Sequence, residues 1–208
     1  MFYLVKSPWI LKKLYSSCIW EINTSEKELF LTFDDGPQPG VTDFVLDQLD
    51  KFNAKATFFC IGKNVVANKE IFERITREGH SVGNHTYTHL NGWKTDDKEY
   101  LRDIEDAKGI IHSDLFRPPY GRITRFQLQQ MNSPRFRLKV IMWSVLSGDF
   151  DPQAGKDQCY LNVASNAGPG SIIVFHDSIK AFEKLKQVLP MVLELFSERG
   201  YIFKAIAL

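Results

Sequence analysis

The sequence predicts an α/β fold in which helices cover a sheet of parallel strands. Short apolar runs alternate with longer segments of helical periodicity, and this alternation is typical of β/α units. The chain has 208 residues, 44% of them hydrophobic and 25% charged, which is the composition of an ordinary globular domain. This order of elements allows two closures, an open doubly wound sheet or a barrel.

Three strands and three helices are expected in the first half of the chain. The strands are the apolar runs at residues 29–33, 56–60 and 81–83. Thr42 is a candidate N-cap for the first helix, whose buried face includes Leu49. The second helix covers residues 65–78 and ends at Gly79, and the third covers residues 96–111.

Four more strands and three more helices follow. The strands are expected at residues 115–116, 139–145, 171–175 and 201–206. The helices are expected at residues 124–131, 158–167 and 179–199. Pro190 lies inside the last helix, where its ring and its missing N–H predict a kink or a break. The total is about seven strands and six helices.

We expect a single domain at residues 29–208, with residues 1–28 packed on it as an N-terminal strap. The uncharged run between Lys6 and Lys12 is five residues long. A secretory signal needs roughly 7–15 apolar residues and a membrane span about 20. The cytoplasm is therefore the expected location, with association with the cell envelope left open. A second hypothesis is contact with a membrane surface through Trp9, Ile10, Leu11, Lys12, Lys13, Leu14 and Tyr15.

Charge and cysteine content exclude several classes of protein. The 26 Lys and Arg residues balance 25 Asp and Glu residues, and a net charge of +1 gives no basic surface for nucleic acid. Cys18, Cys60 and Cys159 are far apart and form no C-x-x-C pair. We therefore expect neither a disulfide framework nor a thiolate zinc site, but three small buried hydrophobic side chains.

A candidate metal site follows two of the predicted strands. Asp34 and Asp35 come directly after the first strand, where one carboxylate could bind a cation while the other exchanges protons. A solvated Asp-Asp-Gly-Pro turn is the alternative. His85 and His89 follow the third strand, and on a helical turn this spacing places both rings on one face. Two imidazoles and one carboxylate suit Zn²⁺ or another first-row divalent ion.

Three further polar residues also follow predicted strands. Arg117 precedes two prolines that fix its backbone, so its guanidinium is a suitable partner for a carboxylate that must stay ionised. His176 ends the sixth strand, and a nearby carboxylate such as Asp149 would make it a general acid. The alternatives are a rigid surface loop and a structural core histidine. Together, the clusters supply the groups for metal-assisted hydrolysis of an amide or an ester.

Three motifs resemble those of the polysaccharide deacetylases of the NodB-homology type, carbohydrate esterase family 4. They are Thr32-Phe33-Asp34-Asp35-Gly36-Pro37, His85-Thr86-x-x-His89 and Arg117-Pro118-Pro119-Tyr120. The resemblance implies a distorted (β/α) barrel with about seven parallel strands. It also implies hydrolytic removal of acetyl groups from N-acetylated or O-acetylated sugars, so the expected partner is an acetylated glycan or sugar precursor.

The resemblance also implies a role for each site residue. Asp35, His85 and His89 would bind one divalent metal ion, with Zn²⁺ expected and Co²⁺, Ni²⁺ or Mn²⁺ as alternatives. Asp34 would be the general base, and Arg117 would tether it. The backbone N–H of Tyr120 would donate to the oxyanion. His176 would be the general acid, with Asp149 as its partner.

Two motifs depart from the family pattern. The fourth usually reads Asp-x-x-Asp-Trp, whereas this chain has Leu146-Ser147-Gly148-Asp149-Phe150. The fifth usually reads Leu-x-His, whereas this chain has Val174-Phe175-His176. Because both replacements are smaller and apolar, they predict a roomier acyl pocket.

Three rival functions stay open at this point. The first is hydrolysis of a non-sugar amide at the same site, and the second is a carbohydrate-binding barrel without activity. The third is a non-haem Fe(II) oxygenase, because two histidines and one carboxylate can form a facial triad. That last function leaves Arg117 and the pairing of His176 with Asp149 without a purpose. The oligomeric state stays open as well.

Overall fold

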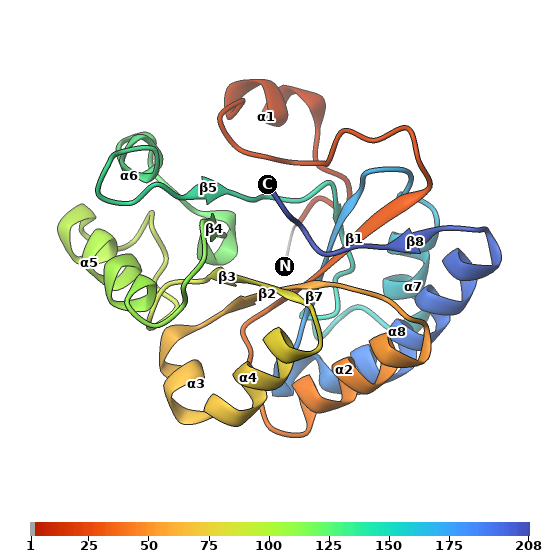
Figure 1. Cartoon of the computed structure of the whole chain (residues 1–208). Helices are drawn as coiled ribbons and strands as arrows, with labels where there is room; N and C mark the ends of the chain where they lie inside the picture. Colours follow the sequence, from red (N-terminus) through yellow and green to blue (C-terminus); the bar gives the residue numbers. More distant parts are fainter. Residues whose placement is uncertain (1–2) are drawn as a thin grey trace.

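The computed structural model describes residues 3–208, in which a sheet of parallel strands is surrounded by helices (Figure 1). The strands are β1 (Glu28–Asp34), β2 (Thr57–Cys60), β3 (Ser81–Asn84), β4 (Leu115–Phe116), β5 (Lys139–Val140), β6 (Val145–Leu146), β7 (Ile172–His176) and β8 (Ile202–Phe203). The helices are α1 (Trp9–Leu14), α2 (Val41–Lys51), α3 (Gly62–Ala67), α4 (Lys69–Arg77), α5 (Asp97–Lys108), α6 (Arg125–Met131), α7 (Lys156–Ala164) and α8 (Ile179–Glu198).

The strands form an incomplete barrel. They are hydrogen-bonded in the order β5-β4-β3-β2-β1-β7-β6, and β8 pairs with the start of β1. Every pair is parallel. β5 and β6 are the two ends of this order, yet they follow each other directly in the chain. The sheet therefore curves, and its two ends flank one opening. The predicted distorted (β/α) barrel is therefore confirmed.

The register of the central strands positions the polar residues. Asp34, the last residue of β1, lies opposite Phe59 of β2 on one side and His176 of β7 on the other. β3 ends at Asn84, so His85 begins the loop that follows it. Because parallel strands end at the same face of a barrel, these residues share one rim.

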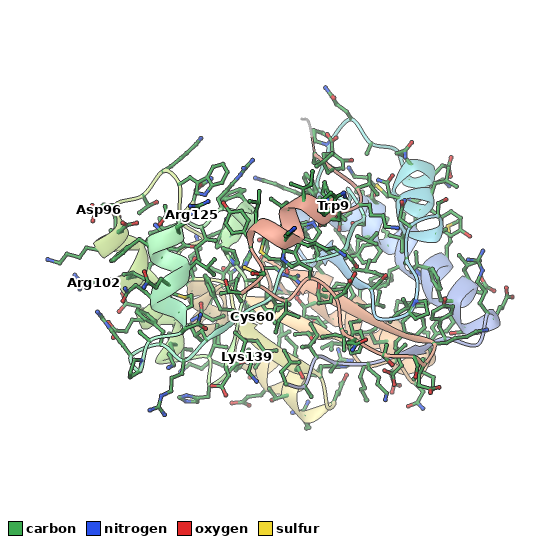
Figure 2. All side chains as sticks on the ribbon, turned by 90° about the horizontal axis from the view of Figure 1, so that it is seen from above. Trp9, Cys60, Asp96, Arg102, Arg125 and Lys139 are labelled. Carbon is green, nitrogen blue, oxygen red and sulfur yellow. The ribbon has the colours of Figure 1, made fainter. Side chains whose placement is uncertain are left out.

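The main core lies between the sheet and the helices around it. Leu31 and Phe33 of β1 are fully buried in a cluster that includes the apolar faces of α2 and α8. Burial of one such side chain stabilises the fold by about 1.5–3 kcal/mol. Cys60 lies near the middle of the molecule (Figure 2). The three cysteines are buried and free, as predicted.

The N-terminal segment covers the open side of the barrel between β5 and β6. The N–H of Leu146 donates to the carbonyl of Val5 at 2.8 Å, and Ile19 forms a parallel bridge with Ile141. These contacts pair backbone groups that would otherwise form free strand edges. The division into a strap at residues 1–28 and a domain at residues 29–208 stays a proposal.

Helix α1 carries several apolar side chains on the outside of the molecule. Trp9, labelled in Figure 2, is 70% exposed, and Leu14 is 62% exposed. Contact of this segment with a membrane surface stays a prediction. Among residues 3–208, none of the helices combines the length and the apolar character needed to cross a bilayer.

The predicted strand at residues 139–145 is wrong, because this stretch forms two short strands at opposite ends of the sheet. β5 and β6 are separated by residues that cross the open side of the barrel. There the N–H of Met142 donates to the carbonyl of Ile19 at 2.7 Å. Ile141 and Met142 are buried. Their apolar character therefore reflects burial rather than a continuous strand.

The predicted helix at residues 65–78 is also wrong, because two helices, α3 and α4, meet at Asn68. The backbone of Asn68 leaves the helical region, with φ −132° and ψ 54°. Its side-chain amide donates to the carbonyls of Pro37 and Asn64 at 3.1 and 3.0 Å. Asparagine side chains compete in this way with regular helix formation.

Of the kink or break predicted at Pro190, the break does not occur, since α8 continues through the proline from Ile179 to Glu198. Buried apolar side chains flank Pro190 on both sides, and they include Leu189 and Val192. A proline inside a helix costs about 3 kcal/mol. Each buried aliphatic side chain returns about 1.5–3 kcal/mol. Packing of α8 therefore outweighs the missing hydrogen bond.

Candidate active site

The two aspartates at the end of β1 have different partners. Asp34 is buried, and its Oδ1 accepts a hydrogen bond from Nη1 of Arg117 at 2.7 Å. Asp35 has a left-handed backbone, with φ 82°. Its Oδ1 lies 3.1 Å from Nε2 of His89 and 3.7 Å from Nε2 of His85. One carboxylate therefore faces a guanidinium, and its neighbour faces two imidazoles.

The loop after β3 carries His85 and His89. The expected helical turn is absent, because Thr86 and His89 adopt left-handed conformations, with φ 63° and 65°. The Nδ1 of His85 lies 2.8 Å from the carbonyl oxygen of Arg117. Because only a protonated nitrogen can donate there, Nδ1 carries the hydrogen and Nε2 keeps a free lone pair toward Asp35. Loop geometry, rather than helical spacing, brings the two rings together.

The donor set fits a divalent metal ion. Ligand atoms of Asp35, His85 and His89 all lie within 4.8 Å of one another. The Oδ1 of Asp35 is buried and has no hydrogen-bond partner within the described residues. An unsatisfied buried carboxylate oxygen is costly, and a cation would satisfy it. One carboxylate and two imidazoles are typical ligands of Zn²⁺, with an open position left for water or substrate.

The protonation states of His85 and Asp35 also favour a cation. Burial lowers the pKa of His85 to about 4, so its ring is neutral at pH 7. Burial alone would raise the pKa of Asp35, but the imidazoles of His89, His176 and His85 outweigh it and hold this pKa well below its usual value. Metal ions require neutral imidazole and ionised carboxylate, so both residues are in their ligand forms.

Arg117 is fully buried, and all three nitrogens of its guanidinium donate hydrogen bonds. Besides Asp34, it donates to Oγ1 of Thr32 at 2.6 Å and to the carbonyls of Ile141 and Met142 at 3.2 and 3.0 Å. Its guanidinium also stacks over the ring of Phe59 at 4.1 Å. Such a fixed guanidinium holds the neighbouring carboxylate in one orientation.

His176 and Asp149 form a second pair beside the metal site. The Nδ1 of His176 lies 2.8 Å from Oδ1 of Asp149, and the backbone N–H of His176 donates to Oδ2 at 2.7 Å. Burial alone would lower the pKa of His176, but the charge of Asp149 raises it to about 10. The ring is therefore protonated at pH 7 and can donate a proton.

Tyr120 lies on the rim of the site within the short 3₁₀ turn Pro119–Gly121. Its backbone is left-handed, with φ 60°. Its ring packs edge-on against His89, with the centroids 4.7 Å apart, and the side chain is 57% exposed. The structure thus brings all eight predicted site residues to one rim, and Tyr120 is the most exposed of them.

Sequence reasoning missed two buried carboxylates that support the site. Asp103 of α5 accepts hydrogen bonds from the backbone N–H groups of Tyr87 and Thr88, both at 2.9 Å. It thereby holds the loop that carries the two histidines. No local signal identifies Asp103, because its partners are distant in sequence.

The second missed carboxylate, Asp177, directly follows His176. This position beside a predicted site residue was a signal in the sequence that could have identified it. It accepts from the N–H of Gly36 at 3.0 Å and from Oγ1 of Thr42 at 2.6 Å. Thr42 therefore is not the predicted N-cap, since α2 begins after Gly40. A Cβ on Gly36 would lie 1.9 Å from Asp177, so only glycine fits there.

Comparisons with known proteins agree on one family. A family model described as polysaccharide deacetylase matches residues 21–138. A peptidoglycan-N-acetylglucosamine deacetylase of Bacillus cereus is 32% identical over 193 residues, and the match covers 90% of each chain. The peptidoglycan-N-acetylmuramic acid deacetylase PdaC of Bacillus subtilis is 32% identical over 190 residues, which cover 86% of this chain and 38% of PdaC. The chain therefore spans well under half of the full PdaC sequence.

Solved structures show the same likeness. The crystal structure of the Bc1960 peptidoglycan N-acetylglucosamine deacetylase matches with a TM-score of 0.87 and 30% identity, and it covers 96% of this chain and 95% of the other. The structure of the peptidoglycan deacetylase PdaC from Bacillus subtilis matches with a TM-score of 0.78 and 31% identity, and it covers 89% of this chain and 90% of the other.

Proposed function

Because the chain belongs to the polysaccharide deacetylase family, we propose that it removes acetyl groups from N-acetylglucosamine units of peptidoglycan. The family resemblance of the three motifs is confirmed, and with it the class of carbohydrate deacetylase. One protein similar in sequence and one solved structure are both named peptidoglycan N-acetylglucosamine deacetylase, and they support this choice of substrate. The observation that carries the proposal is the single rim on which Asp35 faces two imidazoles while Asp34 faces Arg117.

Asp35, His85 and His89 would hold the metal ion, for which we propose Zn²⁺. When bound, a divalent cation supplies a Lewis acid that polarises the acetyl carbonyl and lowers the pKa of water. The contribution of the chain is to fix the three ligands. His85 is oriented by the carbonyl of Arg117, and the loop of both histidines is held by Asp103.

Asp34 is the proposed general base. It adjoins Asp35 in the chain, so it lies beside the proposed metal ligands without being one of them. The hydrogen bond from Arg117 orients its carboxylate for accepting a proton. Asp34 would take this proton as water attacks the acetyl carbon.

His176 is the proposed general acid. An amine anion is too poor a leaving group to depart unprotonated, so the nitrogen of the sugar must receive a proton as the C–N bond breaks. His176 lies opposite Asp34 in the pairing of β1 with β7, and Asp149 keeps its ring charged. The backbone N–H of Tyr120 would donate to the oxyanion.

Acetate release from defined substrates tests this function. The substrates are peptidoglycan fragments, chitin oligomers, acetylated xylan and a simple N-acetyl amide, each with the untreated, the chelated and the Zn²⁺-restored protein. We expect acetate from peptidoglycan fragments, loss after chelation and recovery with Zn²⁺. Release from the simple amide alone would favour a non-sugar amidase. Sugar binding without any acetate release would favour an inactive barrel and would contradict the proposal.

A further inference from the structure

The N-terminal segment reaches the candidate active site at Tyr3. Residues 5–7 run antiparallel to β6, since Lys6 bridges Val145 and the N–H of Leu146 donates to the carbonyl of Val5. Continuing this register by three residues places Tyr3 opposite Gly148. Gly148 immediately precedes Asp149, the partner of His176. The pairing of residues 5–7 with β6 therefore determines where Tyr3 lies.

Gly148 provides the space that Tyr3 occupies. Its backbone has φ 81°, a conformation that other residues rarely adopt. A Cβ at this position would lie 2.4 Å from the hydroxyl oxygen of Tyr3 and 3.1 Å from the amide nitrogen of Asn162. The tyrosine hydroxyl therefore packs directly on the glycine backbone, and any side chain there would displace it.

Tyr3, Phe150 and His176 form a row of three aromatic rings. The centroids of Tyr3 and Phe150 are 5.2 Å apart with the planes tilted by 59°. The centroids of Phe150 and His176 are also 5.2 Å apart, with the planes at 65°. Ring pairs at these distances contact each other and limit each other's movement. Tyr3 thus contacts the proposed acid through one intervening ring.

The position of Phe150 links this row of rings to the acyl group of the substrate. A general acid must lie within hydrogen-bond reach of the leaving nitrogen, and the acyl carbon is one bond away from that nitrogen. The ring of Phe150 packs edge-on against the acid, so it adjoins the space in which the acyl group must fit. Movement of Phe150 would therefore change the size of that space.

We propose that Tyr3 is a specificity-determining residue of the deacetylation, because it backs Phe150 and so keeps the acyl space too small for groups longer than acetyl. This inference rests on the proposed function. It also modifies the expectation of a roomier acyl pocket. Phenylalanine is smaller than the usual tryptophan, but a second aromatic ring from the N-terminal segment stands behind it.

Acyl selectivity of substituted proteins tests the role of Tyr3. We compare kcat/KM for N-acetyl and N-propionyl glucosamine oligomers in the wild type, Tyr3→Ala and Tyr3→Phe. We expect Tyr3→Ala to raise the propionyl-to-acetyl ratio about tenfold, since one methylene in a pocket is worth roughly 10–200-fold in discrimination. Tyr3→Phe keeps the ring and should retain the wild-type ratio. Leu4→Ala is the matched control, because Leu4 is the 49% exposed neighbour on the same segment.

A second measurement does not depend on activity. In the metal-free protein, the ring-proton NMR shifts of His176 should move in Tyr3→Ala and stay in place in Leu4→Ala, because Phe150 shifts against the imidazole. Equal loss of both acyl activities in Tyr3→Ala, with unchanged His176 signals, would overturn the role of Tyr3 and leave the deacetylase intact. A wild type that releases neither acyl group would instead refute the proposed function, and with it the claim for acyl selectivity.

Discussion

Two adjacent carboxylates at the end of β1 acquire different chemistry from their neighbours. Asp34 meets a buried guanidinium, whereas Asp35 meets two imidazoles and keeps one oxygen without a hydrogen-bond donor. Asp35 has a left-handed backbone, with φ 82°, directly after the last residue of β1. A base and a metal ligand can therefore come from consecutive residues without competing for the same partners.

Asp34→Asn separates proton transfer from metal binding. Asparagine is nearly the same size but accepts no proton, so we expect acetate release to fall by about 10²–10⁴-fold. The bound Zn²⁺, measured by elemental analysis, should stay at the wild-type level. His85→Ala should lose both activity and metal, and the exposed Asp50→Asn serves as the control. Near-normal turnover by Asp34→Asn would show that another group is the base.

The pairing of Asp149 with His176 predicts a change in the pH dependence. The acid must hold its proton, so kcat falls as pH rises through the pKa of His176. The charge of Asp149 is the largest influence that raises this pKa. Asp149→Asn should therefore move the alkaline limb of the kcat profile to lower pH and cut the rate on the order of 10²-fold near neutrality.

The exposed Asp157→Asn on α7 is the control for that profile. It should leave the alkaline limb where it is in the wild type. If Asp149→Asn also left the limb unchanged, the titrating group would be something other than His176.

The proposed metal ligands, base and acid could be predicted from the sequence together with their partners Arg117 and Asp149, whereas more remote supports could not. Asp35 and His85 stand immediately after two of the predicted strands, and strand ends share a rim in parallel sheets. Asp103 and Tyr3 act on loops and rings more than ten residues away in the chain. Such contacts depend on register and helix placement, which no short motif encodes.

At the scale of whole elements, helix α5 supports the loop that carries His85 and His89. Its N-cap Asp96 accepts from the N–H of Lys98 at 2.9 Å, which fixes where the helix begins. Asp103, two turns later, then points at the backbone of Tyr87 and Thr88. The helix thus links the outer layer of the barrel to the two histidines of the rim.

Asp103→Ala should weaken metal binding without removing a ligand. Loss of its hydrogen bonds frees the loop that holds His85 and His89, and loss of such an outer support typically costs 10–100-fold in metal affinity. Zn²⁺ affinity measured by competition with a chelator should show this loss. Asp106→Ala, on the exposed face of the same helix, is the matched control. An unchanged affinity in Asp103→Ala would mean that the loop holds its shape unaided.

Elements were predicted where a short stretch is regularly buried, and missed where the chain changes direction. The helix at residues 125–131 buries one face, and the strand after Gly170 is a short run buried on both faces. Residues 139–145 are equally apolar, but they cross the barrel instead of continuing a strand. Burial alone does not distinguish these two cases, because both remove apolar surface from water.

At the scale of the whole molecule, the barrel is closed by chain that precedes its first strand. β5 and β6 are the two ends of the sheet order, and each pairs with part of the N-terminal segment. The N–H of Ser7 donates to the carbonyl of Ser144, and the N–H of Ile19 donates to that of Val140. The segment therefore completes both edges, one on each side of the opening.

Removal of residues 1–8 tests how far this closure stabilises the fold. The deletion breaks the pairing of residues 5–7 with β6, including the hydroxyl of Ser7 on the carbonyl of Trp143 at 2.6 Å. Three to four lost hydrogen bonds at about 1 kcal/mol each should lower the free energy of unfolding by roughly 3 kcal/mol, measured by urea denaturation. Zn²⁺ affinity should persist, because the metal ligands follow β1 and β3 while the deleted residues pair with β6. The surface substitution Trp9→Ala is the control and should leave the urea midpoint unchanged. If the deletion also left the midpoint unchanged, the barrel would hold its shape with an open edge at β6.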